Sequence, residues 1–232
     1  MSAAEHIALR RLQTTGQSIE KSSNRVARLS DMPLSQVTRS FVQRSGGRLH
    51  QGDIFRDLLI EKWKRAGADS SDILVSDCVL PYCVLVTQDC DLEHDWRNRS
   101  DARAAKRDKY LRDLLLLPAY PAEQLRTGTH LREAFDESTW VMENYNSDRW
   151  SPIKTNQNER YHYIVGNADF QLPDLAVDFK HYTSVPREQL YELAVTRYRA
   201  TISALFREDL SHRFASYLSR VALPELSVAP AT

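Results

Sequence analysis

Two carboxylates flank a single thiol at the end of an apolar run, in the segment Gln88-Asp89-Cys90-Asp91. Val84 to Val86 read as a buried β-strand, so the pattern predicts that these four side chains stand on the turn that ends the strand. A strand in the core of a protein needs none of them. We therefore take the tetrad as the leading candidate for a functional site.

Asp89 and Asp91 are the stronger pair in this tetrad. At positions i and i+2 of a strand end they would point the same way, where they could bind a divalent cation or share a proton. Asp178, on another predicted strand, could complete a cluster of oxygen ligands. The alternative is structural and at least as well supported: Asp91 caps a turn by accepting hydrogen bonds from backbone N–H groups.

Cys90 is a candidate nucleophile, which needs a nearby base and a stabilised thiolate. Two neighbouring carboxylates oppose a thiolate by like-charge repulsion, which favours the alternative of a small buried side chain. The spacing of Cys78, Cys83 and Cys90 matches no common zinc pattern, so we expect no metal and no cofactor. An odd cysteine count without an export signal predicts reduced thiols in the cytoplasm.

Charge and composition restrict the partners. The 232 residues carry 31 basic and 31 acidic side chains, so no global field attracts nucleic acid or membrane. No apolar run approaches the roughly 20 residues of a membrane helix, and we expect no membrane partner. Residues 1 to 50 hold a local basic excess that could contact phosphates or an acidic protein, although the pattern favours a solvated helical face. These basic residues are Arg10, Arg11, Lys21, Arg25, Arg28, Arg39, Arg44 and Arg48.

The order of the elements predicts an α+β protein. We expect a helical arm over 1–45, a domain over 46–224 and a disordered tail over 225–232. Apolar patterning predicts strands at 49–55, 73–75, 79–86, 114–117, 160–165, 175–182 and 193–202. It predicts helices at 35–42, 122–126, 131–135 and 208–221, and polar loops at 93–109 and 144–158. The run 58–63 fits either a strand or a helix.

Four stretches, taken in order, resemble a group of prokaryotic proteins. They are Gly52-Asp53-Ile54-Phe55, Leu85-Val86-Thr87-Gln88-Asp89-Cys90-Asp91-Leu92, Leu172 to Phe179, and Arg220 to Pro224. The layout is also distantly similar to the PemK/MazF-type toxins. That resemblance implies a partly open SH3-like β-barrel with a closing C-terminal helix, and an activity on single-stranded RNA.

RNA cleavage without a metal needs a base, an acid and a cation for the phosphate. The residue types suggest Asp89 or Asp91 as base, His162 or His181 as acid, and Lys180 or Arg160 as clamp. Gln88 would bind substrate and Asp178 would belong to the same site. His162 also fits an ordinary half-exposed strand residue, and Lys180-His181 fits the solvent end of a strand.

Two functions are therefore predicted. The first is a toxin-like or phage-defence module that acts on RNA as an endoribonuclease or RNA-binding protein. The second is a non-catalytic subunit that binds a partner protein, encoded by a neighbouring gene, through its arm and loops; a homodimer is a further expected assembly. The polar tetrad favours the first. The second is favoured by Leu80-Pro81, because the toxins have Arg-Pro at this place.

Overall fold

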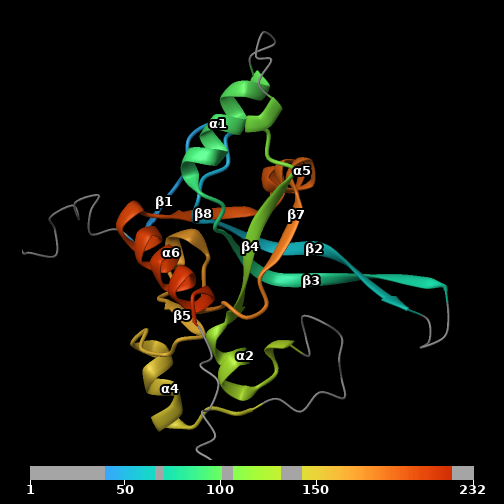
Figure 1. The fold of residues 1–232 in the computed structure, drawn as a ribbon. Coiled ribbons are helices and arrows are strands. Elements are labelled where there is room, and N and C mark those ends of the chain that lie inside the picture. Colours follow the sequence, from blue (N-terminus) through green and yellow to red (C-terminus); the bar gives the residue numbers. More distant parts are fainter. Residues whose placement is uncertain (1–39, 66–70, 101–106, 132–142, 221–232) are drawn as a thin grey trace, which may run out of the picture. The chain divides into compact units, whose positions relative to one another are not determined.

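The computed structural model describes residues 40–65, 71–100, 107–131 and 143–220. In this part the chain is an α+β protein with a strongly curled antiparallel half-barrel sheet and several helices, of which α6 is C-terminal (Figure 1). The strands are β1 (Phe41–Val42), β2 (Asp53–Arg65), β3 (Ile73–Leu85), β4 (Asp113–Pro121), β5 (Tyr161–Ile164), β6 (Leu175–Asp178), β7 (Thr183–Pro186) and β8 (Tyr198–Ile202). The helices are α1 (Asp89–Ser100), α2 (Ala122–Thr127), α4 (Ser147–Lys154), α5 (Arg187–Arg197) and α6 (Ala204–Leu218), with short 3-10 turns at Arg107–Lys109 and Ala168–Phe170.

The strands follow the order β1-β8-β2-β3-β4-β6-β5, and every pairing is antiparallel. β4 organises the sheet, because β3 lies along one of its edges while β7 and β6 share the other. β8 brings the C-terminal part of the chain between β1 and β2. The segments on either side of β1 and β8 therefore meet at one edge of the sheet.

Both faces of the central strands are buried. Val84 and Leu117 belong to a core with Phe214 of α6, whereas Leu85 and Leu116 belong to a second core on the opposite face. Leu92 of α1 and Leu190 of α5 complete that second core. A strand covered on both faces needs apolar side chains at successive positions, which explains the unbroken apolar runs of β3 and β4. A third, smaller core joins α2 and α4 to β5.

Several predicted strands and helices are confirmed. The apolar patterns predicted the places of six elements correctly, although the ends of these elements are shifted. They are the strands β3, β4, β5 and β6 and the helices α2 and α6. The ambiguous run 58–63 is part of the long strand β2. The predicted helix over 131–135 lies almost wholly outside the described residues, as do the tail and most of the N-terminal arm.

The prediction of a polar loop over 93–109 is wrong for its first half, which belongs to helix α1. Only Leu92 and Asp95 of this helix are buried. The Asp95 carboxylate accepts hydrogen bonds from Arg187 Nε at 2.6 Å, Arg99 Nε at 2.7 Å and the Leu111 backbone N–H at 2.9 Å. The helix is thus attached to the domain through a buried acid, and it lacks the apolar stripe by which helices are recognised in a sequence.

Three further predictions need correction. Phe41 and Val42, expected in a helix, form β1 because they pair with Ile202 and Thr201 of β8. The loop over 144–158 contains α4, where the side chain of Asn146 accepts a hydrogen bond from the Arg149 N–H at 3.0 Å and caps the helix. The strand over 193–202 begins only at Tyr198, since α5 occupies the first half.

The chain divides into two compact units, Met1–Leu34 and Ser35–Thr232, and the first lies outside the described residues. Within the described ranges, no helix has the length and hydropathy needed to cross a membrane.

Candidate functional site

The loop between β1 and β2, residues 43–52, is anchored by the buried carboxylate of Asp53. Asp53 is fully buried, and its side chain accepts hydrogen bonds from the Thr201 hydroxyl at 2.6 Å and the His50 backbone N–H at 3.0 Å. Arg44 Nη1 lies 3.7 Å from the same carboxylate. Burial raises the pKa of Asp53 to about 6, against the opposing effects of these two hydrogen bonds and of Arg44.

Gly52 explains why the Gly-Asp pair occurs at this place. Its φ of +90° is unfavourable for other residues, and an added Cβ would lie 3.2 Å from both the Ile202 carbonyl oxygen and the Arg207 side chain. Its N–H donates to the Leu85 carbonyl at 2.7 Å, and its carbonyl accepts from the Ile202 N–H at 2.9 Å. The loop therefore turns into β2 in contact with β8 and α6.

Asp89 holds the same loop from the other side. Its carboxylate accepts hydrogen bonds from Arg48 Nη2 at 3.1 Å and from the Gln51 backbone N–H at 3.2 Å, and it lies 3.5 Å from His50 Nδ1. Burial opposes ionisation of Asp89, but the hydrogen bond and charge of Arg48 outweigh it, so the pKa is lowered. Asp53 and Asp89 thus both accept hydrogen bonds from the loop of residues 43–52 and fix its position.

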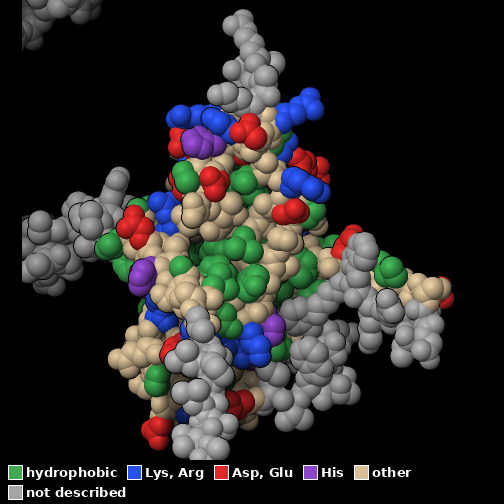
Figure 2. Space-filling view, in the orientation of Figure 1, with side chains coloured by type: hydrophobic (Ala, Val, Ile, Leu, Met, Phe, Trp, Pro, Cys, Tyr) green, Lys and Arg blue, Asp and Glu red, His purple; other side chains and the backbone are tan. Residues whose placement is uncertain are grey.

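The prediction that the tetrad forms a turn with its carboxylates pointing together is wrong. β3 ends at Leu85, and residues 89–91 form the first turn of α1. Successive helical residues are rotated by about 100°, so Asp89 turns toward the loop while Cys90 and Asp91 are exposed. The hydrogen bonds of Cys90 Sγ to described residues go to its neighbours, Gln88 Oε1 at 3.7 Å and Asp91 Oδ1 at 3.9 Å. Charged side chains of both signs surround this end of the domain (Figure 2).

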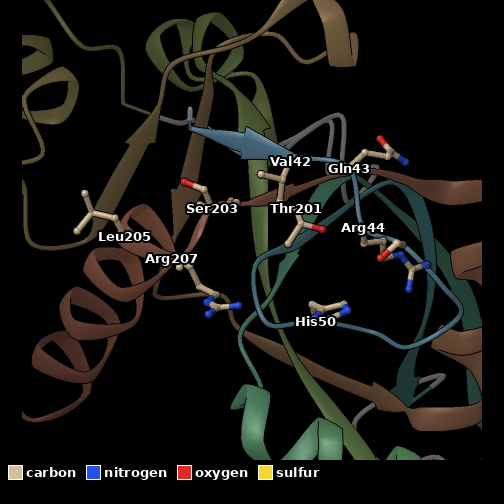
Figure 3. Close-up of a pocket in the computed structure, with 11 residues that line it drawn as sticks. Val42, Gln43, Arg44, His50, Thr201, Ser203, Leu205 and Arg207 are labelled. Carbon is tan, nitrogen blue, oxygen red and sulfur yellow. The ribbon is translucent and has the colours of Figure 1, made fainter. Parts of the chain in front are cut away.

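A pocket of about 530 Å³ opens between the β1–β2 loop and the start of α6 (Figure 3). We call it the Arg-His pocket, after Arg44, His50 and Arg207 in its lining. The other lining residues are Val42, Gln43, Ser45, Thr201, Ile202, Ser203, Ala204 and Leu205. Among the described residues that line the pocket, none has a carboxylate, whereas three have side chains that are cationic or can become so.

The cations of the pocket are fixed by backbone carbonyls. Arg44 Nη1 donates to the Arg48 carbonyl at 2.6 Å, and its guanidinium lies 4.5 Å from the centre of the Tyr198 ring. Arg207 Nη1 donates to the Gln51 carbonyl at 3.3 Å. Each of these hydrogen bonds uses only part of a guanidinium that has five N–H donors, so donors remain for a ligand.

The surroundings of His50 favour its neutral form. Burial lowers its pKa, and the positive charge of Arg48 lowers it further, with smaller contributions from Arg44 and Arg207; only Asp89 acts in the other direction. Arg48 Nη2 lies 2.8 Å from His50 Nδ1. Because arginine can only donate, Nδ1 accepts this hydrogen bond and the ring proton resides on Nε2.

A second hollow of about 460 Å³ continues along the same loop. It shares Gln43 and Arg44 with the Arg-His pocket and adds Gly46, Gly47, Tyr191, Ala194, Val195 and Tyr198. A cationic depression therefore adjoins one with two half-buried tyrosines. The Tyr191 ring stacks on Trp96 with 5.7 Å between the ring centroids and lies 3.9 Å from the Arg187 guanidinium, while Arg44 covers the Tyr198 ring.

Four of the remaining predicted site residues form a separate group at the ends of β5 and β6. Asp178 is fully buried and binds Arg160 through two hydrogen bonds, from Nε at 3.0 Å and from Nη2 at 2.7 Å. It also binds His181 Nδ1 at 2.7 Å and the Lys180 backbone N–H at 2.9 Å. Burial raises the pKa of Asp178, but His181 and Arg160 outweigh it and lower the value to about 2. Both oxygens of the Asp178 carboxylate thus accept two hydrogen bonds each, from residues at the ends of β5 and β6.

His162 belongs to neither group. It is 6% exposed on β5, and its Nδ1 has no hydrogen-bond partner. Burial lowers the pKa of His162 to about 4, assisted by Arg213 and opposed by Asp209. A neutral, enclosed ring of this kind fits a core residue better than a catalytic acid.

No contact between described residues joins Asp178 to Asp89, so the proposed cluster of three carboxylates is not assembled. The described residues also contain no group of three or more His, Cys, Asp or Glu side chains placed to hold a metal ion. No protein-family model matches the chain, and no curated protein sequence matches it either.

His50 and Arg207 were missed in the sequence, while Arg44 and Arg48 were noted only as part of a basic excess. The loop residues could have been noticed in the sequence, because they directly precede the Gly52-Asp53 pair. No pattern in the sequence pointed to Arg207. It lies 157 positions beyond His50, and only the pairing of β8 with β1 and β2 brings it near.

Proposed function

We propose that this protein acts on single-stranded RNA by binding its phosphate groups in the Arg-His pocket. The observation that carries the proposal is the convergence of Arg44, His50 and Arg207 on one open pocket whose described lining residues include no carboxylate. Such donors suit phosphate oxygens. In this proposal the curled sheet is an SH3-like barrel related to the PemK/MazF-type toxins, acting in the cytoplasm.

The state of the acidic residues favours binding over cleavage. Asp53 is buried beneath the loop, and Asp89 is engaged by Arg48 and Gln51. In its neutral form His50 accepts a hydrogen bond from Arg48 at Nδ1 and carries its proton on Nε2, so its second ring nitrogen is a donor and not a base. A ring that donates alongside two guanidinium groups stabilises a phosphate but does not remove the proton of a 2′-hydroxyl.

The proposal is tested by the fluorescence anisotropy of a labelled single-stranded RNA of about 12 nucleotides, titrated with the full chain. Arg44→Gln and Arg207→Gln should each weaken binding about 5- to 10-fold and reduce the slope of log K against log salt by about 1. The matched control is Arg220→Gln, which removes an exposed arginine that pairs with Glu159 near the end of α6. The control should bind as the wild type does.

Binding that is equal in all four proteins, or absent in the wild type, would refute the proposal. The same RNA, analysed for cleavage products, separates the two forms of activity. Products that appear with wild type and disappear with His50→Gln would establish an endoribonuclease and overturn the preference for binding alone.

The second candidate, a non-catalytic subunit of a defence or regulatory complex, is favoured by one separate observation. Five large apolar side chains on the far part of β2 and β3 are exposed: Leu59, Ile73, Leu74, Val75 and Val79. Exposed apolar strands are common sites of protein association. This surface lies on a different element from the Arg-His pocket, so the two functions do not exclude each other.

A further inference from the structure

β2 and β3 continue as an isolated two-stranded ribbon beyond the rest of the sheet (Figure 1). β8 pairs with β2 only over residues 53–55, and β4 pairs with β3 only over residues 82–85. We define the ribbon as 58–65 paired with 73–80. Within the described part of the chain, both of its outer edges lack a neighbouring strand.

The ribbon starts at an irregularity that separates it from the sheet. Asp57 has a φ of +53°, and no register pair joins it to Pro81, although the pairs on either side, Arg56 with Tyr82 and Leu58 with Leu80, are regular. A proline provides no N–H for a ladder, and a left-handed residue bends the strand. The ribbon is therefore a distinct feature of the fold and not an extension of the half-barrel.

One face of the ribbon is apolar and exposed. Four of the residues that alternation and register place on this face are apolar and have exposed side chains, with exposed fractions of Leu59 40%, Val79 47%, Val75 56% and Ile73 57%. An exposed edge strand with such side chains would aggregate unless it is protected. Natural proteins protect such edges with charges, and here the charges have an unusual arrangement.

Glu61 and Asp77 lie directly opposite each other on the same face, between the apolar pairs. Both are exposed, and neither forms an ion pair with any described side chain. Like charges at directly opposed positions destabilise an antiparallel pair. A cation supplied by a partner would neutralise both carboxylates, whereas a second copy packed face to face would bring four carboxylates together.

We infer that the ribbon docks a segment of a partner protein by strand addition to the free edge of β3. The added strand would place alternate side chains beside Val75, Asp77 and Val79. The recognised pattern is therefore an apolar residue, a lysine or arginine two positions later, and an apolar residue after two more. Main-chain hydrogen bonds give affinity in this mode, and the alternate side chains give specificity.

The probe is a synthetic strand peptide with Val, Lys and Val on one face and Thr at the intervening positions. A second peptide has Glu in place of Lys. With the full wild-type chain at low salt, the lysine peptide should bind about tenfold more tightly than the glutamate peptide in fluorescence anisotropy. Hydrogen exchange should show new protection of the amides of 73–80 when the peptide binds.

Asp77→Lys provides the decisive comparison. It places opposite charges across the ribbon, so the variant should remain folded and the ribbon should be more stable. The same variant should prefer the glutamate peptide. Loss of binding through unfolding would lower both stability and affinity, whereas the inference predicts a gain in ribbon protection together with a reversed preference.

The matched control is Asp169→Lys, a charge reversal at an exposed acid outside the ribbon, and it should keep the wild-type preference. Equal binding of the two peptides to wild type, or an unchanged preference in Asp77→Lys, would overturn the inference. Sedimentation that shows a dimer, disrupted by Asp77→Lys, together with no peptide binding would also overturn it and assign the ribbon to a second copy.

Discussion

Replacing His162 by leucine tests whether this histidine is a core residue. Its ring is enclosed on β5, 6.4 Å from the ring of Phe179, and burial is the main cause that lowers its pKa to about 4. The ordinary value is near 6.5. The fold therefore accepts the neutral ring and resists the charged one, so any proton taken up between these two values favours the unfolded chain.

The sign and the size of the effect follow from this difference. Above pH 6.5 the ring is neutral in both states and the protonation of His162 changes nothing. As the pH falls toward 4, the unfolded chain binds the proton first, and stability is lost. The loss from this residue alone is about 2 kcal/mol at pH 5 and about 3 kcal/mol at pH 4. Above pH 6.5, leucine should be nearly neutral in stability because it has a similar volume.

Urea denaturation at pH 7.5 and pH 5 measures the change. Wild type contains other groups that titrate here: His130, with its pKa lowered to about 4, adds to the loss, and Asp53, with its pKa raised to about 6, opposes it. The informative quantity is therefore the difference between wild type and His162→Leu, which should shift by about 2 kcal/mol in favour of the variant at pH 5.

Ile164→Val, on the same strand, is the matched control. It removes one buried methylene and should cost about 1 kcal/mol at both pH values. If wild type and His162→Leu lose the same stability between pH 7.5 and pH 5, the neutral buried ring is refuted. An accessible, protonated His162 would then again be a candidate acid.

Two more substitutions follow from the same contacts. Asp178→Asn should lower the free energy of unfolding at pH 7 by about 2 kcal/mol, because a carboxylate with its pKa lowered to about 2 stabilises the fold above its ordinary pKa of about 4; denaturation curves should show the difference vanish as the pH falls toward 2. In the native protein Cys90 should react rapidly with a chromogenic disulfide while the buried Cys78 and Cys83 react only on unfolding. Cys90→Ser should abolish the rapid phase, and a rapid phase that survives in this variant would contradict the exposure of Cys90.

The sequence predicted the sheet well because apolar runs carry the information. β3 and β4 are buried on both faces, and the C-terminal helix has an apolar stripe, so their patterns are visible locally. α1 could not be predicted in this way. Its buried face consists of Leu92 and the acid Asp95, and that acid is stabilised by Arg187, which lies 92 positions away. A charged run with a buried acid has the sequence of a loop until the distant partner is known.

In the candidate site, too, some features follow from the local sequence and others depend on distant residues. Asp89 was predicted to be a catalytic residue, and the structure shows it bound to Arg48 and Gln51 of the β1–β2 loop. Its position depends on these two residues, which donate to its carboxylate, and on the rotation of a helical first turn that separates it from Asp91. Asp178, predicted to join Asp89, instead binds Arg160, Lys180 and His181 in a separate group, and no pattern in the sequence indicated this arrangement.

The arrangement of carboxylates below the loop and cations inside the pocket determines which substitutions are informative. Removing Asp53 or Asp89 would release residues 43–52, so a loss of RNA binding in these variants would report on the position of the loop. Arg207 is attached to the loop by a single hydrogen bond of 3.3 Å and lies on α6, which has its own core contacts. Arg207→Gln therefore changes the charge of the pocket while leaving the hydrogen bonds of both carboxylates in place. Weaker RNA binding in that variant, with an unchanged melting temperature, would identify the pocket itself as the contact.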